Sequence, residues 1–223
     1  MKPEILSEII AAKNKRQAIA VLTDVKTGAQ QIVRRADVGG HPLAEELEKG
    51  FRFDKSAMVG DLFMAIHNPP LRLMIIGAVL IAQSIIPVAQ ACGFDVSVID
   101  PRGAFATGAR FPEVSLHVDW PQDVLPKLGL DARTGFMALT HDPKIDDPAL
   151  ALALRSDTFY IGALGSKKTQ AARRERLLTM GFDEATLKRI CGPIGLNIGA
   201  VGAAEIAVSI MAEMIKALRM GFE

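Results

Sequence analysis

The stretch LRLMIIGAVLIAQ, residues 71–83, decides the fold. It begins as an unbroken apolar run, reaches Gly77, and passes directly into a helical pattern. A buried strand that turns at a glycine into a helix is typical of the first unit of a Rossmann-like domain.

The same alternation of strand and helix continues downstream. Further strands are predicted at 95–100, 114–118, 135–141 and 158–164, and helices at 80–92, 121–128, 146–155, 167–180, 183–190 and 203–219. Strands this apolar are covered on both faces, which predicts a doubly wound, mostly parallel sheet in an α/β domain. In the last helix an apolar stripe indicates packing against that sheet or a partner.

Upstream, the pattern is different and indicates a small α+β domain. Helices are predicted at 3–13 and 42–49, the second closed by Gly50, and strands at 18–24, 29–33 and 62–67. Asn68, Pro69 and Pro70 then interrupt the pattern. We therefore expect a small N-terminal α+β domain at 1–68 and a Rossmann-like domain at 69–223.

Composition excludes several classes of function. The chain carries 26 basic and 25 acidic residues, a net charge of +1, which gives no reason to expect a nucleic-acid or membrane partner. No apolar stretch reaches the roughly 18 to 20 residues of a membrane span. Cys92 and Cys191 form no close pair, which favours a reducing, cytoplasmic location. The four histidines are scattered and predict no metal site.

The first strand–helix turn is a candidate nucleotide site. In an open parallel sheet, ligands bind beyond the carboxyl ends of the strands. Gly77 and Ala82 occupy the first and last positions of the pattern G-x-G-x-x-G/A, and Ala78 lies between them. Val79 stands at the middle glycine and fills the space that a pyrophosphate needs. The turn is therefore either a nucleotide-binding turn or a purely structural one.

Asp100 ends the second strand, where an acid commonly accepts hydrogen bonds from ribose hydroxyls. It could equally cap its loop or pair with Arg102. Arg102 could instead contact a phosphate. Both residues are candidate cofactor ligands.

Two more strand ends carry polar residues. Thr140, His141 and Asp142 lie at the end of the fourth strand and could bind a polar ligand or transfer protons, although a hydrogen-bonded loop histidine is an equal alternative. Gly165, Ser166 and Lys167 open a basic helix after the fifth strand. Ser166 predicts a cap, and the free N–H groups of a helix start attract anions; the alternative is a solvated basic face. No residue is predicted to be catalytic.

Several segments together carry a family resemblance. They are VIDPR (98–102), LTHDPKIDDPAL (139–150), IGALGSKKT (161–169), GPIGLNIGA (192–200) and AAEIAVSIMAEM (203–214). Over about residues 69–219 the chain resembles the xanthine dehydrogenase accessory family, XdhC/CoxI. The resemblance implies a Rossmann fold, a homodimer, and molybdenum cofactor (molybdopterin) as cargo. It also implies an apo molybdenum hydroxylase as partner, and a cysteine desulfurase as a further one.

The chain departs from the family in two places. Many members have GAGHVAQ where this chain has GAVLIAQ (77–83), and longer members carry a Gly-Gly-Cys segment where the chain reads Gly39-Gly40-His41. A sulfur- or metal-handling role for such a cysteine therefore does not transfer to this chain.

The expected function is that of an accessory protein or chaperone for molybdenum hydroxylases of the xanthine dehydrogenase or carbon monoxide dehydrogenase type. One alternative is an NAD(P)-dependent oxidoreductase, weakened by Val79 and by the lack of a Tyr-x-x-x-Lys pair. The other is an interaction module without a ligand. We expect the cofactor to be held by Gly77, Asp100 and Arg102 on one side and by Thr140, Asp142, Ser166 and Lys167 on the other.

Overall fold

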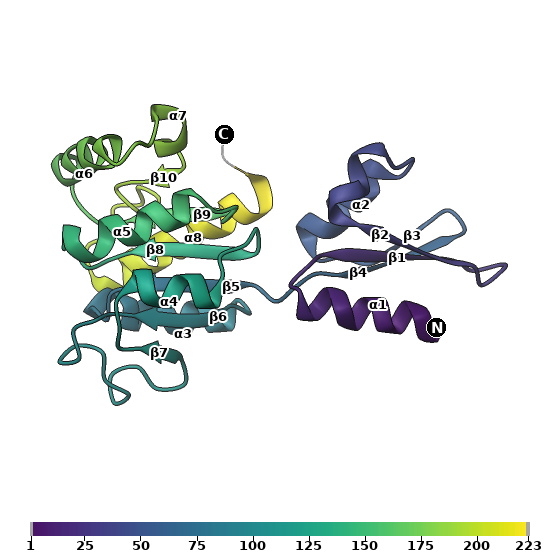
Figure 1. The fold of residues 1–223 in the computed structure, drawn as a ribbon, viewed down its shortest axis with the longest axis horizontal. Coiled ribbons are helices and arrows are strands. Elements are labelled where there is room, and N and C mark those ends of the chain that lie inside the picture. The colour runs from purple at the N-terminus through teal and green to yellow at the C-terminus, as the bar shows by residue number, and fades with distance from the viewer. Residues whose placement is uncertain (1, 222–223) are drawn as a thin grey trace. The chain divides into compact units, whose positions relative to one another are not determined.

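The computed structural model describes residues 2–221 and divides the chain into two compact units. The first extends to Pro69, and the second starts at Pro70. Figure 1 shows a small mixed unit and a larger one with helices on both faces of its sheet. Within residues 2–221 no helix combines the length and the apolar character required to cross a bilayer.

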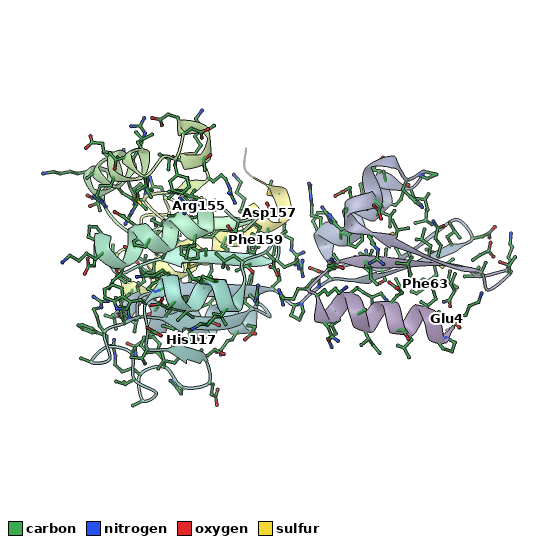
Figure 2. All side chains as sticks on the ribbon, in the orientation of Figure 1. Glu4, Phe63, His117, Arg155, Asp157 and Phe159 are labelled. Atoms are coloured by element: carbon green, nitrogen blue, oxygen red, sulfur yellow. The ribbon has the colours of Figure 1, made fainter. Side chains whose placement is uncertain are left out.

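The N-terminal unit is an antiparallel sheet with a helix on each face (Figure 1). Its elements are α1 (Pro3–Asn14), β1 (Ile19–Asp24), β2 (Gln30–Arg34), the 3₁₀ helix η1 (Arg35–Gly40), α2 (Ala44–Phe53), β3 (Ala57–Val59) and β4 (Leu62–His67). The strand order is β2-β1-β4-β3. Side chains alternate between the two faces along β4: Met64 is buried, whereas Phe63, labelled in Figure 2, is exposed.

The prediction that helix α2 ends at Gly50 was wrong. The helix runs through Gly50 to Phe53, and Asp54 ends it with a left-handed φ of 54°. Gly50 lies inside because α2 approaches the sheet closely there: a Cβ on Gly50 would lie 2.9 Å from side-chain atoms of both Ile66 and Met64. Strand β3 was not predicted, since three residues show no alternation that distinguishes them from a loop.

The C-terminal unit confirms the Rossmann-like α/β fold. Its elements are β5 (Arg72–Ile76), α3 (Leu80–Ala91), β6 (Asp95–Ile99), β7 (Ser115–His117), α4 (Pro121–Leu128), β8 (Thr134–Ala138), α5 (Pro143–Leu154), β9 (Tyr160–Ala163), α6 (Lys167–Thr179), α7 (Glu184–Leu187), β10 (Ile190–Cys191) and α8 (Ala203–Met220). The strand order is β10-β9-β8-β5-β6-β7, and every pairing is parallel. In chain order this is the Rossmann arrangement 3-2-1-4-5-6.

Two apolar cores lie on the two faces of this sheet. Helices α3 and α8 pack together on one face, and the predicted stripe of α8 is part of that core, with Ile210 and Met214 fully buried. Helices α4 and α5 cover the other face. Helix α5 begins at Pro143, three residues before the predicted start at 146, because the side chain of Asp142 caps it there.

Candidate functional site

The end of β5 meets the end of β8 without room for a side chain. Gly77 has a φ of +117°, and a Cβ there would lie 2.8 Å from Cγ2 of Thr140 and 3.2 Å from its backbone nitrogen. An L-residue would be strained by this backbone and would collide with the neighbouring strand end. Gly77 is thus required by the packing of the two central strands, whether or not a ligand binds.

Asp100 is fully buried, and its carboxylate accepts hydrogen bonds from neighbouring groups of the protein. Its carboxylate accepts from the N–H of Ala78 at 2.8 Å and from the N–H, Nε and Nη2 of Arg102 at 3.0, 2.9 and 2.8 Å. Burial opposes its ionisation, but the hydrogen bonds from Arg102 and Ala78 outweigh burial and hold the pKa of Asp100 below its usual value. Asp100 therefore joins the first turn to the end of β6 and has no lone pair directed toward a ribose.

The start of α3 presents apolar surface. Val79 precedes the helix with an extended backbone, no side chain caps the helix, and Leu80 is 68% exposed. Ala78 and Ala82 are completely buried. With Val79 in the place of the second glycine and Asp100 already bonded, the residues of this turn do not fit a dinucleotide.

A buried aspartate organises the segment after β8. Asp146 accepts from Oγ1 of Thr140 at 2.7 Å and from the N–H of His141 at 3.1 Å. Asp142 caps α5 by accepting from the N–H of Lys144 at 2.9 Å. His141 has a left-handed φ of 63°, and the residue is exposed. The hydroxyl of Thr140 and the carboxylate of Asp142 thus serve the loop itself.

Asp146 also faces Arg173, and both side chains are almost completely buried. The Nη2 of Arg173 lies 3.5 Å from Asp146 and donates to the carbonyl of Leu164 at 3.1 Å, while Nη1 donates to Gln170. Burial raises the pKa of Asp146, against the opposing effects of Thr140 and Arg173. Sequence reasoning missed this pair. The only local signal was an acid in the apolar stretch of α5, because its partner lies 27 residues away in the chain.

The start of α6 is the most exposed part of the predicted site. Ser166 accepts from the N–H of Thr169 at 3.2 Å and caps the helix, as predicted. Gly165 has a φ of +136°, and a Cβ there would lie 2.8 Å from Thr169. Lys167 is the first residue of α6 and is exposed. The side chain of Arg102, which follows β6, is 31% exposed. Its hydrogen bond to Asp100 raises the pKa of Arg102, and the carboxylates of Asp142 and Asp146 add smaller contributions in the same direction.

The glycine-rich loop before α8 is held by a carboxylate. Glu213 accepts from the hydroxyl of Tyr160 at 2.6 Å and from the N–H of Gly195 at 2.9 Å. Gly195 has a φ of +96°, and a Cβ there would lie 2.5 Å from Oγ of Ser209. Burial, followed by the charge of Glu213, raises the pKa of Cys191 to about 12, so this thiol is not a nucleophile at neutral pH.

Comparison with known proteins identifies the family. The model of the XdhC Rossmann domain matches residues 73–214. The chain belongs to the XdhC family. The matched segment contains all the strand ends described above, and it begins after the N-terminal unit has ended.

Two relatives of this XdhC chain are named for their roles. The chain is 31% identical over 157 residues to a Bacillus subtilis protein named as a probable subunit of xanthine dehydrogenase, covering 70% of this chain and 46% of the relative. It is 30% identical over 147 residues to the molybdenum cofactor insertion chaperone PaoD of Escherichia coli, covering 66% of this chain and 40% of PaoD. The chain thus spans less than half the length of these relatives.

A solved structure shows that the likeness extends through both units. A protein described as a xanthine dehydrogenase from Bacillus halodurans is 26% identical and superposes with a TM-score of 0.68. The match covers 99% of this chain and 65% of that protein.

Proposed function

We propose that the protein is an accessory protein of a molybdenum hydroxylase, which binds molybdenum cofactor as cargo and delivers it to the apoenzyme. The names of the relatives support this role, since one is an insertion chaperone for molybdenum cofactor and another a probable component of xanthine dehydrogenase. In this proposal the client enzyme carries out the reaction, and this chain binds the cofactor and protects it.

The observation that carries the proposal is the division of the carboxyl edge of the sheet into a closed half and an open half. The dinucleotide turn is closed by Val79 and by the bonds of Asp100. Across β5 and β8, after the end of β9, the start of α6 with Ser166 and Lys167 is exposed and offers a cationic group and backbone N–H groups. The phosphate of molybdopterin is an anion that a helix start and a lysine can bind.

The same geometry weighs against a nicotinamide-dependent oxidoreductase, because the acid expected to bind ribose accepts from Ala78 and Arg102 instead. Cys191 is too weakly acidic to accept sulfur as a thiolate. If a cysteine desulfurase takes part, we propose that it acts on the bound cofactor without a relay through Cys191. We also propose a homodimer and a cytoplasmic location; sedimentation of the purified chain tests the dimer.

Anaerobic binding of molybdopterin tests the cargo proposal. Wild type should bind it, and Lys167→Ala should weaken binding about fivefold, as expected for loss of one exposed charge-assisted contact. The control is Lys127→Ala, an exposed lysine in the last turn of α4. Equal binding by both variants would remove the start of α6 from the site, and no binding by wild type would contradict the proposal.

A second candidate, an interaction module without cargo, is favoured by the apolar residues on this edge. Leu80 and Val201 are 68% and 86% exposed at the starts of α3 and α8. This candidate predicts that the chain binds an apo molybdenum hydroxylase equally well as wild type and as Lys167→Ala. It also predicts that Leu80→Ser abolishes that binding.

A further inference from the structure

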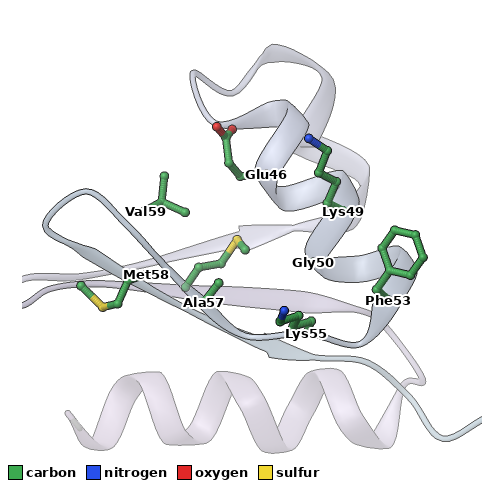
Figure 3. Close-up of a pocket in the computed structure, with 9 residues that line it drawn as sticks. Glu46, Lys49, Gly50, Phe53, Lys55, Ala57, Met58 and Val59 are labelled. Atoms are coloured by element: carbon green, nitrogen blue, oxygen red, sulfur yellow. The ribbon is translucent and has the colours of Figure 1, made fainter.

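A groove of about 600 Å³ opens in the N-terminal unit, between helix α2 and strand β3 (Figure 3). The residues that line it are Glu46, Lys49, Gly50 and Phe53 on α2, Lys55 before β3, Ala57, Met58 and Val59 on β3, and Met64 on β4. Most of this lining is apolar, and Phe53 and Met58 are each more than half exposed. Apolar surface gathered in a groove favours an occupant that covers it.

The strand beside the groove has an unused edge. Strand β3 stands at the end of the order β2-β1-β4-β3, so no strand within residues 2–221 pairs with its outer side. Ala57, Met58 and Val59 lie opposite Met64, Phe63 and Leu62. An exposed edge of this kind is a template for a further strand.

The register shows which groups are available on that edge. Gly60 and Asp61 form a two-residue turn, so Val59 and Leu62 are a hydrogen-bonded pair, and Met58 and Phe63 are a non-bonded pair. The N–H of Ile66, which points toward β3, donates to Oγ of Ser56 at 2.9 Å and fits the same alternation. The N–H and C=O of Met58 therefore point away from β4, toward the open edge.

Charges differ between the two ends of the groove. Figure 3 shows Glu46 with Val59 toward one end, and Lys55 with Phe53 toward the other. The ammonium of Lys55 has no hydrogen bond or ion pair to any residue among 2–221, whereas Lys49 is paired with Glu45 at 2.6 Å. An acidic group on the occupant is thus favoured at the Lys55 end.

We infer that this groove binds an extended segment of another polypeptide, which adds to the sheet as a strand antiparallel to β3. Main-chain groups of the segment bond to Met58, and alternate apolar side chains enter the groove between α2 and β3. Because β3 runs from the Lys55 end to the Val59 end, an antiparallel segment places its C-terminal side at Lys55. The partner motif is therefore a short run of alternating apolar residues followed by an acidic residue. This inference does not depend on the cofactor-binding proposal.

Selection on the full-length chain tests the motif. Octapeptides from a random phage-displayed library should be enriched for alternating apolar residues with Asp or Glu near the C-terminal end. A fluorescein-labelled synthetic peptide of the selected sequence then serves as the probe in fluorescence anisotropy. Lys55→Glu should weaken its binding about fivefold, and a peptide with Lys in place of the acid should recover the loss.

Met58→Pro and Met58→Ala form a matched pair for the edge. Both remove the exposed side chain, but only proline removes the outward N–H, and neither changes a bond to β4. We expect binding to Met58→Pro about tenfold weaker than binding to Met58→Ala. In wild type, the peptide should also slow hydrogen exchange of the Met58 amide at least about tenfold, while the Ile32 amide on the other edge strand, β2, keeps its rate.

Three results would overturn the inference. They are a failure of the library to enrich any sequence; equal peptide affinity of the Met58→Pro and Met58→Ala variants, together with unchanged exchange of the Met58 amide in wild type; and self-association of the chain that Met58→Pro abolishes. The last result would make a second copy the occupant. Because the peptide assay contains no pterin, its failure is separate from failure of the cofactor-binding proposal.

Discussion

Replacing Asp100 with alanine should destabilise the C-terminal unit by about 3 kcal/mol. The carboxylate is fully buried and accepts four hydrogen bonds, one from Ala78 and three from Arg102. Ala78 is also buried, so the substitution leaves an N–H group without a partner, which costs about 1–3 kcal/mol. Arg102 is partly exposed and recovers some of its loss by hydration, which keeps the total at the lower end of the roughly 3–5 kcal/mol of a fully buried pair.

Urea unfolding monitored by tryptophan fluorescence measures this loss selectively. The chain has one tryptophan, Trp120, which lies at the start of α4 in the C-terminal unit. For a unit of this size, about 3 kcal/mol corresponds to a melting temperature lower by roughly 6–12 °C. Asp100→Asn keeps one acceptor oxygen and should lose less than Asp100→Ala.

The pH dependence gives the same carboxylate a second test. The folded pKa of Asp100 lies below its unfolded value, so its stabilisation is present above the unfolded pKa and is lost as pH falls through the folded one. Acid should therefore destabilise wild type more than Asp100→Asn below about pH 4. A loss below about 1 kcal/mol for Asp100→Ala, or identical acid profiles, would refute the role given to this residue.

Three other predictions concern the same unit. Gly195→Ala should lower the free energy of unfolding in urea by about 2 kcal/mol or more, since φ of Gly195 is +96° and a Cβ would collide with a neighbouring hydroxyl. Gly199→Ala should lower it by only about 1 kcal/mol, because φ of Gly199 is +74° but the space around it is open. Equal losses would contradict the packing described. At pH 8 iodoacetamide should modify exposed Cys92 much faster than partly buried Cys191 in mass spectra, and equally rapid modification of Cys191 would be inconsistent with its raised pKa. Val79→Gly should fail to bind NADH in a fluorescence titration, whereas tight binding would show that Val79 alone closes the turn.

The sequence predicted the C-terminal unit well because its strands are continuous apolar runs between glycine and proline signals. The strand that contains Met74 and the helix that contains Ile210 both appear as expected. Strand β3 and strand β10 were missed, since each gains its structure from a neighbouring strand and not from a pattern of its own. Gly50 was misplaced because a glycine can end a helix or allow close packing, and only the position of the sheet distinguishes these.

The candidate site was predicted less completely. The sequence placed Asp100 at a strand end but left open whether it meets a ligand or Arg102, because side-chain contacts depend on the backbone of the turn. It did not find Asp146 with Arg173, or Glu213 with Gly195, since these partners come from elements far apart in the chain. Local signals, such as the cap at Ser166, were correct because they act within one turn.

The most direct test of the central claim is anaerobic purification of the full chain from a host that makes molybdenum cofactor, followed by mass spectrometry of the bound small molecules. The proposal predicts pterin or molybdenum retained by wild type and by Lys127→Ala, and clearly less retained by Lys167→Ala. A nicotinamide nucleotide in place of pterin, or no pterin and no binding when molybdopterin is added back to wild type, would contradict it.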